Sequence, residues 1–108
     1  MATVRVDLGD RSYDIRIEIG GLDGMLADWA AGLASKRTLL IADDTVRGLY
    51  GKRVADALQS GGAAVSEFVF PAGEPSKRFD MWRAGLDACF DAGLDRKSPV
   101  VALGGGVT

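Results

Sequence analysis

The sequence has 108 residues, of which 47% are apolar and 26% charged, and this composition indicates one soluble, globular domain rather than a disordered chain. The formal net charge of -2 and the absence of clustered Lys and Arg exclude a surface for nucleic acid or an anionic membrane. The chain has no His, which excludes His-dependent zinc sites, and its single cysteine, Cys89, allows no intrachain disulfide and is expected to be a buried small hydrophobe.

The first 33 residues predict a hairpin followed by a helix. Residues 3–8 and 12–19 alternate between apolar and polar side chains, and the turn-forming residues 9–11 lie between them. Apolar residues then recur at helical spacing over residues 22–33. We therefore expect an antiparallel hairpin with a helix behind it.

The middle of the chain predicts a strand, a helix and a second strand. Residues 38–42 form a short apolar run without alternation, which is typical of a parallel strand that is buried on both faces. A helical stripe runs from Val46 to Leu58, and the pair of glycines at 61–62 should end that helix. Residues 63–70 are expected to form the next strand, which Pro71 closes.

The last third predicts one more helix and one more strand. Ser76 is expected to cap a helix whose apolar stripe runs from Phe79 to Phe90, and Gly93 should end it. Residues 100–103 are again short and apolar, and three glycines follow. The order of elements predicts an α/β, Rossmann-like domain over residues 1–108, with a mostly parallel sheet, helices on its faces and an N-terminal antiparallel β-hairpin. The strand order is left open, and the hairpin is expected to add antiparallel strands at one side of the sheet.

Three unusual segments each follow a predicted strand directly. They are residues 43–45, 71–77 and 104–108. In an open α/β sheet, ligands bind beyond the carboxyl ends of the parallel strands. These segments should therefore meet along one edge and form a binding site.

The individual residues of these segments also have ordinary structural explanations. Three glycines, 104–106, allow backbone N–H groups to approach a phosphate, but they equally suit a flexible loop, and the usual G-x-G-x-x-G fingerprint is absent. Asp43 is expected to accept hydrogen bonds from a ribose, and Asp44 to cap the following helix.

Other candidate residues leave the same choice open. Glu74 and Lys77 can form a local ion pair, or can bind a sugar hydroxyl and a phosphate. Trp29 and Trp82 lie in apolar helical stripes and are expected in the core rather than against a cofactor.

At this point the motifs resemble those of the 3-dehydroquinate synthase family. The segment L-G-D-R-S-Y-D-I at residues 8–15 resembles the opening hairpin of that family. P-A-G-E-P-S-K at residues 71–77 looks like its P-x-G-E-x-x-K motif, and V-A-L-G-G-G-V at residues 101–107 looks like the segment before its central helix. The order and the intervals also match, so the resemblance spans essentially the whole chain.

The resemblance implies a Rossmann-like NAD-binding domain that precedes an α-helical metal and substrate domain, which this chain lacks. Members convert 3-deoxy-D-arabino-heptulosonate 7-phosphate to 3-dehydroquinate and phosphate in the shikimate pathway, with bound NAD and a divalent metal, zinc or cobalt. The full-length enzyme is expected to be a cytoplasmic homodimer with a small sugar-phosphate substrate, and neither nucleic acid nor a membrane is expected as a partner.

Position by position, the resemblance implies six cofactor-binding residues and no catalytic or metal-binding ones. Asp43 would lie at the adenosine end of NAD, and Glu74 and Lys77 near the ribose and nicotinamide. The pyrophosphate would lie against the backbone of Gly105, Gly106 and Val107. The 108 residues alone are therefore expected to be inactive, to bind NAD weakly and to self-associate.

Two alternatives remain. One is another sugar-phosphate cyclase, such as a 2-deoxy-scyllo-inosose synthase, with dehydrogenases of the iron-containing and glycerol type as more distant options. The other is a nucleotide-binding module without catalysis.

Overall fold

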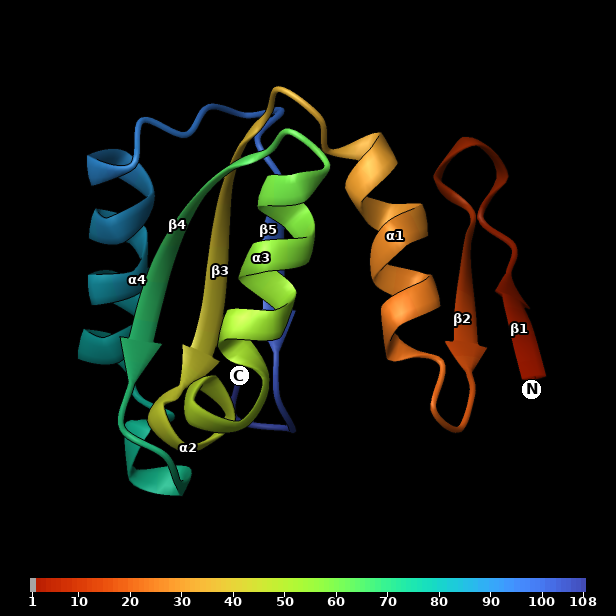
Figure 1. Cartoon of the computed structure of the whole chain (residues 1–108). Coiled ribbons are helices and arrows are strands. Elements are labelled where there is room, and N and C mark those ends of the chain that lie inside the picture. The colour runs from red at the N-terminus through yellow and green to blue at the C-terminus, as the bar shows by residue number, and fades with distance from the viewer. Residues whose placement is uncertain (1) are drawn as a thin grey trace.

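The structure is a computed structural model that describes residues 2–108 and contains two separate β-sheets (Figure 1). The strands are β1 (Ala2–Val6), β2 (Tyr13–Ile17), β3 (Arg37–Asp43), β4 (Ala64–Phe70) and β5 (Val100–Leu103). The α-helices are α1 (Leu22–Gly32), α2 (Asp44–Val46), α3 (Lys52–Ser60) and α4 (Phe79–Asp91). Short 3-10 turns cover Gly9–Arg11 and Glu74–Ser76, and a π-helical turn, Arg47–Gly51, joins α2 to α3.

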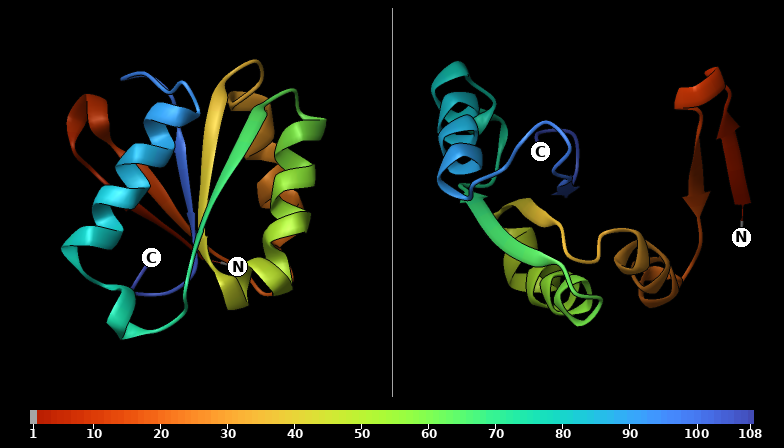
Figure 2. Two further views of the ribbon diagram at one scale, coloured as in Figure 1. Left: turned by 90° about the vertical axis from the view of Figure 1, so that its left-hand side faces the viewer. Right: turned by 90° about the horizontal axis from the view of Figure 1, so that it is seen from above.

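The larger sheet is parallel and has the strand order β4-β3-β5. The central strand β3 pairs along its whole length with β4, from Arg37 opposite Ala64 to Asp43 opposite Phe70. Helices α1 and α3 cover one face of this sheet and α4 lies over the other (Figure 2). The predicted fold class, an α/β Rossmann-like domain with an antiparallel hairpin, is confirmed.

The hydrophobic core lies between this sheet and the pair α1 and α3. Its buried members are Leu26, Ala30, Leu40, Val54, Ala55, Leu58 and Ala63. The side chains of Leu39 and Leu40 in β3 are both only 1% exposed, as the unbroken apolar run of this strand predicts.

The opposite face of the sheet is much less covered. Helix α4 has no fully buried residue, and its Trp82 is 59% exposed. Trp29 on α1 is 56% exposed. The expectation that both tryptophans pack in the core is therefore wrong, because helical periodicity identifies an apolar stripe but not whether another element covers it.

The hairpin forms its own sheet instead of extending the parallel one, so the expectation that it adds strands there is wrong. Its strands pair from Ala2 opposite Ile17 to Val6 opposite Tyr13. The guanidinium of Arg16 binds the carboxylate of Asp28 on α1 at 2.8 Å, so a polar contact joins the hairpin to the rest of the chain.

The ends of the helices follow the sequence signals in most places. Gly62 and Gly93, which follow α3 and α4, have φ angles of 100° and 72°, and glycine adopts this left-handed conformation without strain. The expected cap at Ser76 is wrong, because Ser76 belongs to a 3-10 turn and α4 begins only at Phe79, after Arg78. Within residues 2–108, no helix is long and apolar enough to cross a membrane.

Candidate functional site

Because β3, β4 and β5 are parallel, the three segments that follow them lie at the same edge of the sheet (Figure 1). Residues 43–45 follow β3, residues 71–77 follow β4 and residues 104–108 follow β5. The structure therefore brings the three predicted segments together, as the crossover order required.

The N-cap at the end of β3 is Asp43, so the expectation that Asp44 caps the following helix is wrong. The Asp43 Oδ1 accepts the Val46 N–H at 2.7 Å. Asp44 reaches across to the next segment, where its Oδ1 accepts the Ala72 N–H at 3.0 Å. Asp43 lies at the last position of the strand with an extended backbone, which suits a cap, while Asp44 is already helical.

The loop after β4 is a compact turn that is stabilised by hydrogen bonds between its own residues. Gly73 has a φ of 110°, which favours glycine, and the 3-10 turn Glu74–Ser76 follows it. The buried hydroxyl of Ser76 donates a hydrogen bond to the carbonyl oxygen of Pro71. Ser76 therefore closes the loop on itself.

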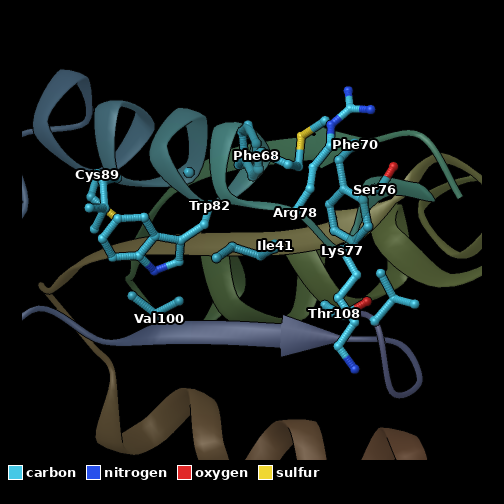
Figure 3. Close-up of a pocket in the computed structure, with 14 residues that line it drawn as sticks. Ile41, Phe68, Phe70, Ser76, Lys77, Arg78, Trp82, Cys89, Val100 and Thr108 are labelled. Atoms are coloured by element: carbon cyan, nitrogen blue, oxygen red, sulfur yellow. The ribbon is translucent and has the colours of Figure 1, made fainter. Parts of the chain in front are cut away.

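Glu74 and Lys77 are exposed, and no ion pair forms between them in the part of the chain that the structure describes. The local ion-pair explanation is therefore wrong for this structure. Lys77 borders a cavity together with Thr108 (Figure 3), and Val107 from the same segment after β5 also lines it. Glu74 does not line that cavity.

The glycine loop leaves its backbone open. A Cβ atom added to Gly105 or Gly106 would meet no other atom within 4 Å, and both residues are exposed. Gly104 differs, because its φ is 148° and the side chain of Thr108 occupies the place of its Cβ. Within residues 2–108, the fold therefore leaves room for a larger side chain at two of the three glycines.

The cavity lies between α4 and the sheet and has a volume of about 420 Å³. Its wall is mostly apolar and combines residues of α4 and of the three strands, namely Ile41, Phe68, Phe70, Met81, Trp82, Gly85, Leu86, Cys89 and Val100. Its polar end holds Ser76, Lys77, Arg78 and Thr108. Cys89 is half-buried in this wall, which corrects its expected burial.

Two cations lie at this polar end, and sequence reasoning identified only one of them. Arg78 borders the cavity beside Lys77, while its guanidinium binds the Asp80 carboxylate at 2.7 Å. The position of Arg78 next to a P-x-G-E-x-x-K segment was the available signal. Lys77 is the cation there without an ion-pair partner among the described residues.

No group of three or more His, Cys, Asp or Glu side chains that could hold a metal ion is found within residues 2–108. The described residues therefore do not fit a metal centre, and no metal ligand is assigned to this chain.

Comparisons with known proteins relate the chain to one group of enzymes. No family model matches it. The chain is 43% identical to a 3-dehydroquinate synthase of Desulforamulus reducens, over 99% of this chain and 30% of that protein. It is 41% identical to the enzyme of Lactococcus lactis subsp. cremoris and 38% identical to that of Rhizobium johnstonii, over 97% of this chain and 30% and 28% of theirs.

A solved structure has the same fold. This chain superimposes with a TM-score of 0.79 on a crystal structure of 2-deoxy-scyllo-inosose synthase in complex with carbaglucose-6-phosphate, NAD+ and Co2+, over 98% of this chain and 28% of that one. The sequence identity is 19%, so this likeness establishes the fold alone.

The chain spans about 30% of the length of the curated relatives that it matches, and the match covers nearly all of its own residues. The resemblance that the motifs indicated is therefore confirmed: over nearly all of its length, this chain is similar to one portion of the 3-dehydroquinate synthases.

Proposed function

We propose that this chain is the NAD-binding part of a 3-dehydroquinate synthase. The complete protein would convert 3-deoxy-D-arabino-heptulosonate 7-phosphate to 3-dehydroquinate and phosphate. The main support is the meeting of residues 43–45, 71–77 and 104–108 at the carboxyl edge of one parallel sheet, since this is where such sheets bind nucleotides.

NAD suits the residues at this edge. The open backbone at Gly105 and Gly106 would approach the pyrophosphate, because a glycine without Cβ lets the phosphate oxygens reach the N–H groups. The backbone of Val107, which follows them, would complete this contact. Glu74 and Lys77 are exposed and form no ion pair with each other. The Glu74 carboxylate can therefore accept hydrogen bonds from ribose hydroxyls, and the Lys77 ammonium can lie near the nicotinamide end. Asp43 would bind at the adenosine end with the carboxylate oxygen that the cap leaves free.

When bound, NAD supplies a temporary hydride acceptor for a substrate alcohol. The residues of this chain contribute binding and orientation. A divalent metal, zinc or cobalt, belongs to the proposal for the complete protein, with ligands outside these residues. The structural neighbour that holds NAD+ and Co2+ supports this pair of cofactors for the fold.

The second candidate is a cyclase of the 2-deoxy-scyllo-inosose synthase type, which the structural neighbours favour. The sequence comparison favours the first, since the identity is 43% to a 3-dehydroquinate synthase and 19% to the neighbour. Phosphate release by the complete protein from the heptulosonate phosphate would support the first candidate, and no release from that substrate would favour the second.

Titration of the complete protein with NAD tests the binding edge. Glu74→Ala and Lys77→Ala should each weaken NAD binding by about tenfold or more, with unfolding free energies changed by less than about 1 kcal/mol, because both side chains are exposed. Asp91→Ala and Lys97→Ala are matched controls, since Asp91 is the exposed last residue of α4 and the exposed Lys97 lies beyond it, both at the opposite end of this helix. Normal NAD affinity in both test variants would refute the proposed site.

For the complete protein, we also propose a homodimer in the cytoplasm that acts on a small sugar phosphate and binds neither nucleic acid nor membranes. For these 108 residues, the net charge of -2 supports the last two points, since it offers no excess of cations for polyanions.

A further inference from the structure

The segments after β3 and β4 are joined by one side chain. Asp44 and Ala72 are 28 residues apart in sequence, and the Asp44 carboxylate accepts the Ala72 N–H at 3.0 Å. Among the hydrogen bonds and ion pairs of side chains in residues 2–108, this is the contact that joins the end of β3 to the Pro71–Lys77 loop.

The rest of that loop depends on local contacts. Ser76 binds Pro71 through its hydroxyl, and its N–H donates to the Gly73 carbonyl oxygen at 3.1 Å. The N–H of Lys77 donates to the Glu74 carbonyl oxygen at 2.9 Å. These bonds set the shape of the loop, but they do not set where the loop lies relative to β3. Most loop residues are also exposed, so little packing holds them there.

We propose that Asp44 is a positioning residue that fixes the Pro71–Lys77 loop against the end of β3. It would thereby hold Glu74 and Lys77 at a set distance from Asp43. The adjacent Asp43 does not make this contact, since its Oδ1 accepts the Val46 N–H within its own segment. This inference rests on the proposed function only where NAD affinity is concerned, since the hydrogen bond itself is independent of any ligand.

A charged acceptor suits this task. Hydrogen bonds from a backbone N–H to a carboxylate are stronger than neutral ones, although exposure to water reduces the difference. Asparagine has the same side-chain geometry and keeps one carbonyl oxygen, so it can accept a hydrogen bond from the same N–H. Alanine removes the acceptor altogether.

The test compares Asp44→Ala, Asp44→Asn and Asp43→Ala in the complete protein. Hydrogen exchange at the Ala72 amide should be about tenfold faster in Asp44→Ala and close to normal in Asp44→Asn. NAD affinity should fall about tenfold in Asp44→Ala and be rescued in Asp44→Asn. Asp43→Ala is the contrast, because it should expose the Val46 amide and leave the Ala72 amide protected.

Each outcome is decisive. Unchanged exchange at Ala72 in Asp44→Ala would overturn the proposal, and so would faster exchange with unchanged NAD affinity. If the parent protein bound no NAD, the proposed function would fail, and the exchange at Ala72 would then decide alone whether Asp44 fixes the loop. The proposal would also be overturned if Asp44→Ala lowered the melting temperature and the faster exchange were spread over the chain instead of being confined to residues 71–77. That result would indicate a general loss of stability.

Discussion

At the scale of single residues, two adjacent aspartates make different hydrogen bonds. Asp43 and Asp44 are adjacent and chemically the same, yet one caps a helix and the other binds a loop 28 residues away. The difference comes from the backbone, which is extended at Asp43 and helical from Asp44 onwards. Local sequence predicts that one of two acids is a cap, and the exact boundary of the strand decides which.

The glycine loop allows a sharp prediction at this scale. Gly105→Ala and Gly106→Ala should weaken NAD binding by about tenfold or more in the complete protein, because a methyl group would keep the pyrophosphate away from the backbone. The folded chain itself has room for that methyl group at either position, so its stability should hardly change. NAD titration and thermal melting measure the two effects.

Gly104→Ala is the matched control in the same loop. Its φ of 148° and the adjacent Thr108 side chain mean that this variant should lose stability whether or not NAD is present. Equal losses of stability in all three variants would contradict the distinction between glycines needed by the fold and glycines needed by a ligand.

At the scale of elements, the packing of α1 against α3 depends on a close approach at the end of α3. A Cβ atom on Gly61 would lie 2.6 Å from the Ala30 Cβ and 2.9 Å from the Ala30 carbonyl oxygen. The φ of Gly61 is -81°, which any residue adopts, so proximity rather than backbone conformation requires a glycine here.

Gly61→Ala should therefore lower the free energy of unfolding by about 1–3 kcal/mol, the usual cost of overpacking. Gly24→Ala is the control, since it lies within α1 with no atom near the added methyl group. It should raise the free energy of unfolding by about 0.5–1 kcal/mol through helix propensity. Chemical denaturation measures both, and a neutral Gly61→Ala would contradict the close approach.

An exposed ion pair also joins α1 to α3. The Arg53 guanidinium binds the Asp23 carboxylate at 2.8 Å, and this hydrogen bond lowers the pKa of Asp23 below its ordinary value. A carboxyl whose pKa is lower in the folded state stabilises the fold above its unfolded pKa and stops doing so as the pH falls through the folded one.

Asp23→Asn should thus be slightly less stable than the parent at pH 7, and the gap should close as the pH falls below the ordinary aspartate pKa of about 3.9. Denaturation curves at several pH values measure this. When Arg53 is replaced by Gln, the difference in stability between the protein with Asp23 and its Asp23→Asn variant should be absent at every pH. A difference that persists there would mean that Asp23 acts through something other than Arg53.

At the scale of the whole molecule, apolar surface is distributed unevenly. Helices α1 and α3 each bury apolar residues against the sheet, although Trp29 of α1 is exposed. Helix α4 buries none fully and leaves large side chains in solvent, among them Phe79, Trp82 and Phe90 at 72%, 59% and 76% exposure. Strand β5 pairs only with β3 within residues 2–108, so its other edge is open. Exposed apolar patches and open strand edges favour association.

We therefore expect the 108-residue chain to self-associate as its concentration rises, which sedimentation velocity would measure. Phe90→Gln should reduce the association without unfolding the chain, because this side chain is mostly in solvent already. Leu49→Gln is the control, as Leu49 is 68% exposed on the π-helical turn, outside α4. A chain that stays monomeric at every concentration would contradict this expectation.

The sequence by itself determined the class of fold and the edge at which a ligand would bind. Short apolar runs, helical stripes and terminating glycines are local signals, and a strand, helix, strand order permits few arrangements in space. The meeting of residues 43–45, 71–77 and 104–108 followed from that order alone.

Only the tertiary structure decided what depends on distant partners. Ser76 closes a loop instead of capping α4, Trp82 borders a cavity instead of filling a core, and the hairpin stands apart from the parallel sheet. The contact of Asp44 with Ala72 is of the same kind. Periodicity reports which face of an element is apolar, whereas the element that meets this face is set by the path of the whole chain.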